Sequence, residues 1–482
     1  MENIFETNVL DSNEAKVMDK LTIESGIMEE TLMEQAAFAI ADVASSFSPK
    51  KILCVAGTGN NGGDCIAAGR ILHNKGYNVE IYIYGKNQSN GFKKQLLIAE
   101  NYGLKIKYNK DFSDEYDLII DGLIGIGLNG EVRSSIKTVI EKINSSNAKV
   151  ISEDIPSGIS SDTGEVMGDA VHADITITFG NLKIGQILYP GREFSGKLKI
   201  AELSFKKFIS NRKIITPDII KVPNRKKDSH KYDYGNVLIL AGSSKYPGAP
   251  ILTALGAQRI GAGLVTLITP GDSSKILSFE PSIIYSSLNK NNFEKNDLKK
   301  LNDEIERANV IILGPGMTED SIEFVVELIK KQGRTKNIVL DAESIQAIKE
   351  FESLSENILI TPHVGEMKKI FKNLKNNIFE LERFSKQKKC IIMLKSSITT
   401  ITDGEKTFFN LLGSSSLSKG GSGDLLSGIV GGLIAQGLDT INACITGSYI
   451  MYKTAKELSN EYTEYFITPK LISENLYIGF KL

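Results

Sequence analysis

Residues 418–432, SKGGSGDLLSGIVGG, combine a glycine-rich turn, one carboxylate and the start of an apolar helix. Gly420, Gly421 and Gly423 carry no Cβ, so successive backbone N–H groups can converge on one anion. The positive end of the helix dipole favours a phosphate at the same point. A carboxylate beside a phosphate is repelled unless it has a task, such as accepting a proton from an attacking hydroxyl. The turn therefore predicts an anion site in which Asp424 is either a general base or a helix cap.

Polar side chains also lie at the ends of three predicted strands in the first half of the chain. Asn60, Asn61 and Asp64 follow the first strand, Asp121 ends the second, and Asp154 and Ser157 lie at or after the end of the third. Ligands of parallel sheets bind beyond the carboxyl ends of the strands, so we expect one shared cleft. Each residue also has an ordinary role as a turn former or strand cap. Oxygen ligands of this kind suit an alkali cation, whereas no His or Cys set suits zinc.

Residues 125–130, GIGLNG, contain glycines that permit close backbone approach to a phosphate. This spacing alone is a weak signal, and the acidic residue that binds a dinucleotide ribose is not evident about 20 residues later.

The second half of the chain repeats the arrangement. Polar or flexible residues lie beyond its predicted strands, namely Gly316, Asp341, His363, Lys395 and Asp424. His363 is either structural or part of the site, and Lys395 either ends its strand in solvent or holds a phosphate. Their common position predicts a second ligand site at one sheet edge.

Strands and helices alternate along the chain, which predicts mostly parallel sheets with helices on both faces. In the first half, two helices between residues 12 and 47 precede strands at 51–56, 77–85, 116–121, 148–154 and 173–180, with helices at 92–101 and 132–143. In the second half, strands are expected at 236–242, 263–270, 309–317, 337–344, 357–366 and 390–397. Asp403 and Gly404 are expected to turn a hairpin. The fold class is therefore α/β, with two three-layer αβα domains.

Residues 206–234 interrupt this pattern, because they are rich in Lys and Arg, contain two prolines and lose apolar periodicity. We place the domain boundary near residue 215, which gives domains 1–215 and 216–482. The basic residues are expected to form a solvated linker rather than a nucleic-acid site.

The composition excludes several classes of protein. The 482 residues include 57 Lys and Arg against 58 Asp and Glu, so binding to nucleic acid or to a membrane surface is not expected. The widely spaced Cys54, Cys65, Cys390 and Cys444 indicate reduced thiols and a cytoplasmic protein. The first residues lack a signal-peptide pattern, and no apolar run reaches the roughly 18 residues that a membrane span requires.

Ten motifs together resemble those of the bifunctional NAD(P)H-hydrate repair enzymes. They are GTGNNGGD (57–64), GIGLNGEVR (125–133), DIPSG (154–158), SHKYDYG (229–235), GSSKYPGAP (242–250), GPGM (314–317), LDAES (340–344), TPHVGE (361–366), LKSSIT (394–399) and KGGSGD (419–424). The resemblance covers nearly the whole chain. It implies an N-terminal Rossmann-like epimerase domain and a C-terminal ribokinase-like dehydratase domain. The chain departs from the family pattern at Cys65, Tyr232 and Ser396, where glycine is usual, and at Glu343, where aspartate is common.

The resemblance implies repair of NADH or NADPH that has been hydrated at C6 of the nicotinamide ring. The first domain would interconvert the R and S epimers of the hydrate. The second domain would dehydrate the S epimer at the expense of ADP, giving AMP and phosphate, with ATP as the alternative donor. Hydroxide is a poor leaving group, so the C6 hydroxyl is first phosphorylated, and Asp424 would accept its proton.

The resemblance also assigns the site residues. The epimerase contacts to the hydrate are Asn60, Asn61, Gly62, Gly63, Asp64, Gly125, Ile126, Gly127, Leu128, Asn129, Gly130, Glu131 and Asp154. The dehydratase contacts are Ala249, Gly316, His363 and Asp424, and the nucleotide contacts are Lys395, Ser396, Ser397, Ile398, Thr399 and Gly423. Potassium is expected at Asn61, Asp121 and Ser157, and Mg²⁺ with ADP. Asp154 is expected to take part in proton transfer at the hemiaminal carbon.

Two other interpretations remain at this point. The chain is alternatively a vitamin or sugar-like kinase fused to a non-catalytic Rossmann-like binding module, and the product distinguishes this from the repair enzyme. A conventional dehydrogenase fits less well, because the acidic residue that would bind the ribose of its dinucleotide is not evident in the sequence. A homo-oligomer is expected, with the apolar helices before Lys51 and after Asp439 as its interface.

Overall fold

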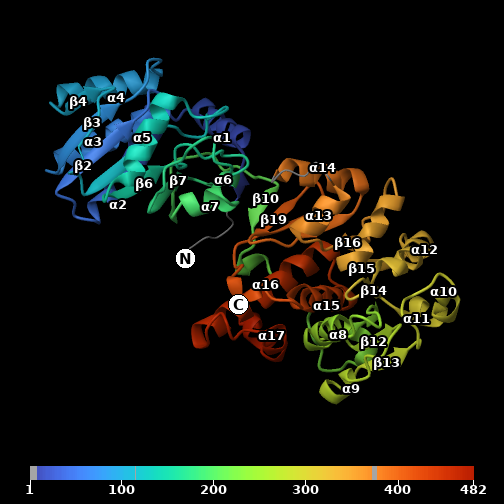
Figure 1. Cartoon of the computed structure of the whole chain (residues 1–482). Coiled ribbons are helices and arrows are strands. Elements are labelled where there is room, and N and C mark those ends of the chain that lie inside the picture. Colours follow the sequence, from blue (N-terminus) through green and yellow to red (C-terminus); the bar gives the residue numbers. More distant parts are fainter. Residues whose placement is uncertain (1–7, 114, 372–376, 482) are drawn as a thin grey trace. The chain divides into compact units, whose positions relative to one another are not determined.

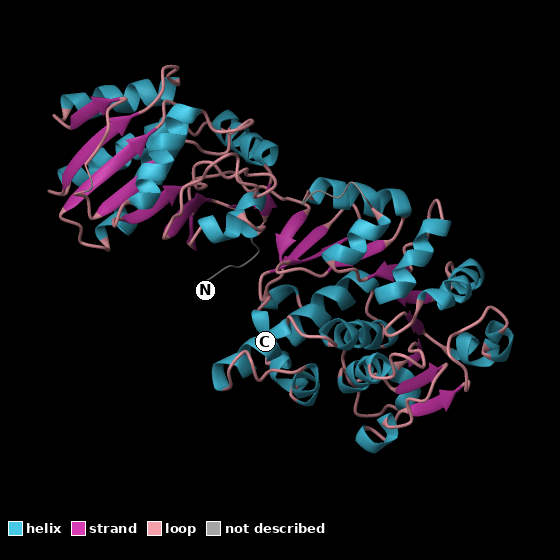
Figure 2. Ribbon diagram, viewed as in Figure 1, coloured by secondary structure: helices cyan, strands magenta, loops and turns pink. Residues whose placement is uncertain are grey.

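The computed structural model describes residues 8–113, 115–371 and 377–481. Within them the chain divides into two compact units, residues 8–210 and 211–481, which we call the first and the second domain. Figure 2 shows the strands of the two domains gathered into separate sheets. No helix in the described ranges is both long enough and apolar enough to cross a membrane.

The first domain is built on a sheet of seven parallel strands (Figure 1). Their spatial order is β4 (Lys105–Tyr108), β3 (Asn78–Ile83), β2 (Lys51–Ala56), β5 (Leu118–Gly122), β6 (Lys149–Glu153), β7 (Ile175–Phe179) and β9 (Lys197–Ala201). A separate parallel pair joins β1 (Val9–Leu10) to β8 (Leu182–Lys183). The central strands are almost wholly buried, as expected for a parallel sheet that is covered on both faces.

Helices cover both faces of this sheet. They are α1 (Ser12–Glu24), α2 (Glu29–Ser45), α3 (Asn60–Asn74), α4 (Asn90–Asn101), α5 (Ser134–Ser145), α6 (Ile184–Ile187) and α7 (Gly191–Phe194). Side chains alternate along β2, so that Ile52 and Cys54 pack with α2, α3 and α4, while Leu53 and Val55 pack with α5. Figure 1 shows α5 crossing one face of the sheet.

The second domain contains a sheet of ten strands. Their order is β10 (Arg212–Ile214), β19 (Thr407–Asn410), β18 (Thr399–Thr402), β17 (Ile391–Leu394), β16 (Ile358–Ile360), β15 (Asn337–Leu340), β14 (Val310–Leu313), β11 (Asn236–Leu240), β12 (Leu264–Thr269) and β13 (Ile284–Ser287). All pairs are parallel except the two that β18 makes with β17 and β19. The predicted hairpin at Asp403 and Gly404 is confirmed, with Gly404 at φ +88°.

Ten α-helices and six 3₁₀ helices accompany this sheet in the described residues. The α-helices are α8 (Ala249–Arg259), α9 (Ile276–Phe279), α10 (Asp297–Lys300), α11 (Asn302–Arg307), α12 (Ile322–Gln332), α13 (Val364–Ile370), α14 (Ile378–Lys388), α15 (Ser422–Ala435), α16 (Thr440–Glu461) and α17 (Pro469–Glu474). The 3₁₀ helices are η1 (Pro217–Ile219), η2 (Lys231–Tyr234), η3 (Glu319–Ser321), η4 (Ala342–Glu350), η5 (Ser415–Leu417) and η6 (Leu476–Phe480). A Cβ on Gly428 of α15 would lie 1.9 Å from the Thr253 carbonyl oxygen of α8, so glycine permits this close helix pair.

The α/β fold class is confirmed, but the sequence analysis missed four edge strands. Three of them, β4, β9 and β13, are only partly buried, and Lys side chains dilute the apolar pattern of β4 and β9. The fourth, β10, lies inside the basic stretch where no strand was expected, and it pairs with β19. Strands at the edge of a sheet are covered less fully than central ones, so their side chains include more polar residues.

Candidate active sites

A cavity of about 820 Å³ opens at the carboxyl ends of the first domain's strands. Of the predicted hydrate contacts, Asn60, Asn61, Asp64, Gly125, Ile126, Gly127 and Asp154 line it. Gly62 and Gly63 are buried in α3 beside it, and residues 128–131 continue the Gly125 loop on the surface. The cavity therefore brings together residues from three strand ends that are far apart in the sequence.

Two positions beside the cavity, one at the start of α3 and one in the loop after β5, require glycine for steric reasons. A Cβ on Gly62 would lie 2.0 Å from the Gly57 carbonyl oxygen, and a Cβ on Gly125 would lie 2.6 Å from Asn61 Oδ1. The start of α3 and the loop after β5 therefore approach each other closely, and Asn60 and Asn61 at the N-terminal end of α3 line the cavity.

Asp121 is wholly buried and holds the neighbouring loop in place. The Ser157 hydroxyl donates to its Oδ1 (2.6 Å), and the Ser152 hydroxyl (2.8 Å) and the Ser157 N–H (3.0 Å) donate to its Oδ2. Burial raises the pKa of Asp121, and these hydrogen bonds offset the rise only in part. The Ile124 N–H donates to the Ser157 hydroxyl oxygen (2.8 Å), so the loop after β5 is tied to the loop after β6.

This cluster fits a low-charge cation better than a transition metal. The described residues contain no group of three or more His, Cys, Asp or Glu side chains that could hold a metal ion. The oxygens of Asp121, Ser157 and Asn61 are instead one carboxylate, one hydroxyl and one amide, the donors that hard cations accept. The Nδ2 of Asn61 is buried without a hydrogen-bond partner among the described residues.

Asp154 is held by a lysine that the sequence analysis missed. Lys183, at the end of β8, forms a buried ion pair with Asp154 and also donates to the Thr178 hydroxyl oxygen (2.9 Å). Asp154 adopts a left-handed backbone conformation with φ 57°, which is uncommon for a residue with a side chain. A lone Lys inside the apolar stretch after β7 was the available sequence signal.

Two more carboxyls of the cavity are poorly solvated. Burial, together with nearby Asp154, Asp19 and Glu29, raises the pKa of Asp64 well above its usual range. Burial also raises the pKa of Asp19 on α1 to about 6, against the opposing effect of Lys183. No local sequence signal identifies Asp19, because helix α1 reaches the cavity only through tertiary packing.

Glu153 is fully buried, and neither of its carboxyl oxygens has a hydrogen-bond partner in the described part of the chain. A Cβ on Gly122 would lie 2.5 Å from both Cys65 Cβ and Glu153 Oε1, so Glu153 packs beside Cys65. Burial and the nearby carboxylate of Asp64 raise the pKa of Glu153 well above its usual range. Such a carboxyl destabilises the fold at neutral pH.

Replacing this carboxyl by an apolar side chain of similar length, Glu153→Met, is expected to stabilise the first domain by about 1–3 kcal/mol at pH 7.5. Because the folded-state pKa is raised, the part of the wild-type penalty that comes from ionising Glu153 is absent below the unfolded-state pKa of about 4.3 and grows as the pH rises. Thermal unfolding of the full chain at pH 7.5 and pH 4 measures the effect, with the exposed Glu141→Met as the control. A gain equally large at both pH values would contradict it.

In the second domain, Asp424 stands in the first turn of α15 and does not cap it. The residue before the helix is Gly421 in a left-handed conformation (φ 96°), and no side chain caps the helix. Burial, with nearby Asp341 and Glu366, raises the pKa of Asp424 to about 6, while Lys395 opposes the rise. Of the two interpretations drawn from the sequence, the geometry favours a proton acceptor over a cap.

Lys395 reaches the glycine turn from the end of β17. Its Nζ lies 2.5 Å from Asp341 Oδ1, and a Cβ on Gly423 would lie 3.0 Å from the same ammonium. The Ser427 hydroxyl donates to the other Asp341 oxygen (2.6 Å). Burial alone would raise the pKa of Asp341 and lower that of Lys395, but their pairing outweighs it, so the pKa of Asp341 is lowered and that of Lys395 is raised.

His363 caps α13, which is the structural role considered from the sequence. Its Nδ1 accepts from the Gly365 N–H (2.9 Å), while the side chain remains largely exposed. A β-bridge joins His363 to Lys395, so both face the same sheet edge. A Cβ on Gly316 would lie 3.2 Å from Ala249 Cβ, which places these two predicted contacts together.

The predicted nucleotide segment is divided between surface and core. Ser396 and Ser397 are exposed, whereas Ile398 and Thr399 are buried and the Thr399 hydroxyl bonds to the Tyr452 hydroxyl (2.7 Å). The Ser396 hydroxyl donates to the Ile398 carbonyl oxygen (2.7 Å), which closes the turn.

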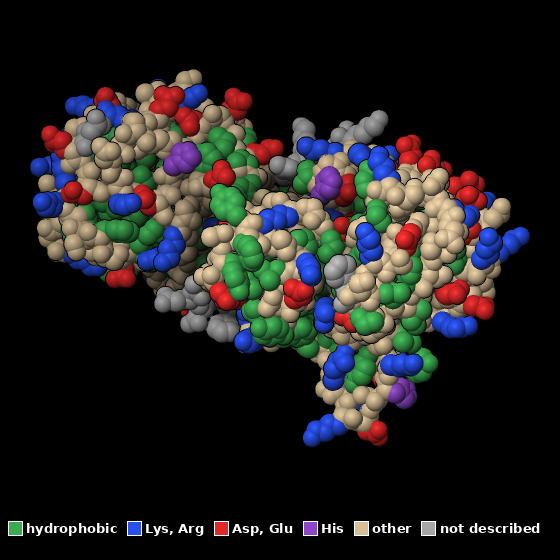
Figure 3. All heavy atoms as spheres, turned by 60° about the horizontal axis from the view of Figure 1, so that its bottom comes forward, with side chains coloured by type: hydrophobic (Ala, Val, Ile, Leu, Met, Phe, Trp, Pro, Cys, Tyr) green, Lys and Arg blue, Asp and Glu red, His purple; other side chains and the backbone are tan. Residues whose placement is uncertain are grey.

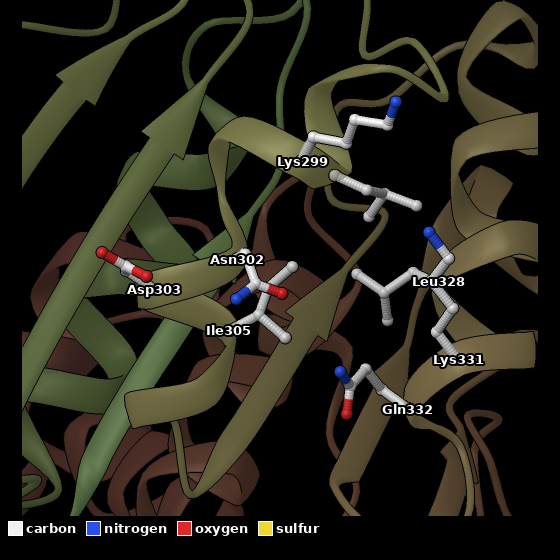
Figure 4. A pocket seen from close by; sticks show the side chains of 8 residues that line it. Lys299, Asn302, Asp303, Ile305, Leu328, Lys331 and Gln332 are labelled. Atoms are coloured by element: carbon white, nitrogen blue, oxygen red, sulfur yellow. The ribbon is translucent and has the colours of Figure 1, made fainter.

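Other surface features lie away from these groups. A hollow of about 390 Å³ lies between α10, α11 and α12 and contains no predicted site residue in its lining. Figure 4 shows the lining side chains, among them Lys299, Asn302 and Lys331. On the face drawn in Figure 3, basic and acidic side chains are interspersed.

The folds and sites define the chain as two αβα domains, each with polar groups gathered at the carboxyl edge of its sheet. The family model described as YjeF-related protein N-terminus matches residues 29–185, and the model described as NAD(P)H-hydrate dehydratase matches residues 237–477. The chain belongs to the family of bifunctional NAD(P)H-hydrate repair enzymes.

Individual relatives agree with this assignment. The chain is 31% identical to the bifunctional NAD(P)H-hydrate repair enzyme of Thermofilum pendens, covering 91% of this chain and 89% of that protein. It is 34% identical to the enzyme of that name from Dictyoglomus turgidum, covering 90% of each. Among solved structures, a ribokinase-like superfamily protein from Enterococcus faecalis matches with a TM-score of 0.51 and 25% identity, over 57% of this chain and 97% of that one.

The Lys395 and Asp341 pair yields a stability prediction for the second domain. Lys395→Met leaves the Asp341 carboxylate buried without its partner and is expected to cost about 3–5 kcal/mol. Adding Asp341→Asn removes the unpaired charge and should recover most of the loss. Urea unfolding measures both variants, with the exposed Lys406→Met as the control. If Lys395→Met unfolds at the same urea concentration as the wild type, the Lys395–Asp341 ion pair does not stabilise the second domain.

Proposed function

We propose that the chain repairs hydrated NADH and NADPH with both of its domains. The first domain interconverts the R and S epimers of the hydrate, and the second dehydrates the S epimer at the expense of ADP. The observation that carries the proposal is that each matched domain keeps its polar groups at one sheet edge, with Asp64 and Asp154 in the first and Lys395 and Asp424 in the second. The vitamin or sugar-like kinase is not favoured by the comparisons.

In the proposed dehydratase site, Asp424 accepts the proton of the C6 hydroxyl while the hydroxyl oxygen attacks the terminal phosphorus of ADP. A pKa of about 6 makes Asp424 ionised at neutral pH and still basic enough to take a proton. Lys395 lies at the glycine turn, where its ammonium can stabilise the phosphate charge. AMP leaves, and the C6 phosphate then departs with loss of a C5 proton, which restores the ring double bond.

We assign the substrate contacts to the residues that the family resemblance indicates in each domain. The hydrate in the second domain would contact Ala249, Gly316, His363 and Asp424, and the nucleotide would contact Gly423 and residues 395–399, with ATP as the alternative donor. Mg²⁺ bound with the nucleotide would neutralise phosphate charge. In the first domain the hydrate would lie against residues 60–64, residues 125–131 and Asp154. The proposal keeps the functional boundary between the domains near residue 215, close to the division between residues 210 and 211.

Potassium is proposed at Asn61, Asp121 and Ser157 in the first domain. The three residues fit it because they supply a carboxylate, a hydroxyl and an amide oxygen, which are hard ligands with one negative charge in total. A bound cation would supply positive charge at the cavity and fix the loop that follows β5.

We also propose a cytoplasmic homo-oligomer. All four cysteines are buried and free, which suits a reducing compartment. The side chains of Phe466 and Tyr465 beyond α16 are 61% and 94% exposed, so this segment offers an apolar surface for a second copy.

The test follows recovery of the reduced-nicotinamide near-UV absorbance from a mixture of both hydrate epimers. With ADP the wild type is expected to recover all of the absorbance, and without nucleotide none. Asp424→Asn should lower the rate about 100-fold or more, because the proton acceptor is lost. The wild-type rate should fall about tenfold per pH unit below pH 6, as Asp424 becomes protonated.

Asp303→Asn, an exposed carboxylate of the same domain, is the matched control. Recovery that stops at the S epimer would remove the epimerase proposal. A stable phosphorylated product in place of restored NADH or NADPH would establish the small-molecule kinase. Undiminished recovery by Asp424→Asn would overturn the role of Asp424 as the proton acceptor.

A further inference from the structure

The two carboxyls that line the first-domain cavity, Asp64 and Asp154, have opposite surroundings. Asp154 is paired with the buried ammonium of Lys183, and the Thr178 hydroxyl also donates to it (3.3 Å). Asp64 has no hydrogen-bond or ion-pair partner among the described residues, although it lines the same cavity. A carboxyl that lacks a cationic or hydrogen-bonding partner and has negatively charged neighbours holds its proton more firmly than a carboxyl in water.

The charged groups around Asp64 reinforce this difference. Asp19 approaches from α1, Glu29 from α2 and Asp154 from the loop after β6, and all three raise the pKa of Asp64 in addition to burial. Glu153 from β6 is also near. Three lysines line the cavity: Lys16 and Lys20 are exposed on α1, whereas Lys183 is buried and its ammonium is bound to Asp154. Asp64 lies beyond the first turn of α3, so the helix dipole opposes these effects only weakly.

We propose that Asp64 is the general acid of the epimerase site and that Asp154, held by Lys183, is the general base. This inference rests on the proposed epimerase function and deepens it, because it divides the proton transfers between two named carboxyls. Two carboxyls whose environments push their protonation states apart are the usual basis of such a division.

Opening and closing the hemiaminal ring requires both a general base and a general acid. Asp154 takes the proton of the C6 hydroxyl, the C6–N1 bond breaks, and its electron pair moves to N1. Asp64 gives its proton to N1, and C6 becomes an aldehyde carbon. Rotation about the C5–C6 bond presents the other face of the carbonyl. Ring closure then returns one proton to Asp64 and one to the oxygen, so no cofactor or water is consumed.

The experiment measures epimerisation alone, without nucleotide, by starting from one purified epimer and following the other chromatographically. Asp64→Asn is expected to lower kcat at least about 100-fold relative to wild type, with little change in KM. The wild-type rate should fall at high pH as Asp64 loses its proton, and this fall should be absent from the residual activity of Asp64→Asn. Asp64→Glu should recover part of kcat, because it restores the carboxyl.

Three comparisons decide the outcome. Asp42→Asn, an exposed carboxylate on α2, should epimerise as the wild type does, and dehydration of the S epimer with ADP should be unchanged in every variant. If Asp64→Asn keeps the wild-type kcat, or if Asp19→Asn abolishes activity while Asp64→Asn does not, the proposal is wrong. If Asp64→Glu recovers nothing and Asp64→Asn also loses substrate binding, Asp64 is structural. A wild type that does not epimerise would overturn the proposed function instead.

Discussion

The direction of the strands constrains both sites. Parallel strands place all their carboxyl ends at one edge of a sheet, and helices on both faces leave that edge as the accessible place for polar groups. In the first domain β2, β5 and β6 deliver Asn61, Asp121 and Asp154 to this edge. In the second domain β15 and β17 deliver Asp341 and Lys395 to the turn before α15.

The second constraint is that a buried charge needs a partner. Asp154 has Lys183, and Asp341 has Lys395 and the Ser427 hydroxyl. Among the described residues, Glu153, Asp64 and Asp424 lack such a partner, and burial raises the pKa of each. Of the three, Asp64 lines the first-domain cavity and Asp424 lies at the glycine turn of the second domain. Carboxyls with strongly shifted pKa values concentrate at functional sites, because an unpartnered buried carboxyl lowers the stability of the fold. The same energetic rule therefore separates the groups that hold the site together from the groups that can move protons.

The sequence predicted the central elements well, because their apolar runs and glycine turns are local signals. The order of strands and helices, the hairpin at Asp403 and the gathering of Asp121 with Ser157 all follow from such signals. Lys183 and Asp19 were missed, because only tertiary packing brings β8 and α1 to the cavity. The capping by His363 depends on the backbone geometry of α13, which the sequence leaves open between a structural and a site role.

The central claim is that two independent sites act in sequence on one substrate. The most direct measurement supplies the purified R epimer with ADP to Asp154→Asn, to Asp424→Asn and to an equal mixture of the two variants. Each variant alone should recover little near-UV absorbance, and the mixture should recover nearly all of it, because the S epimer made by one chain is dehydrated by the other. Full recovery by either variant alone, or failure of the mixture while the wild type succeeds, would contradict the account.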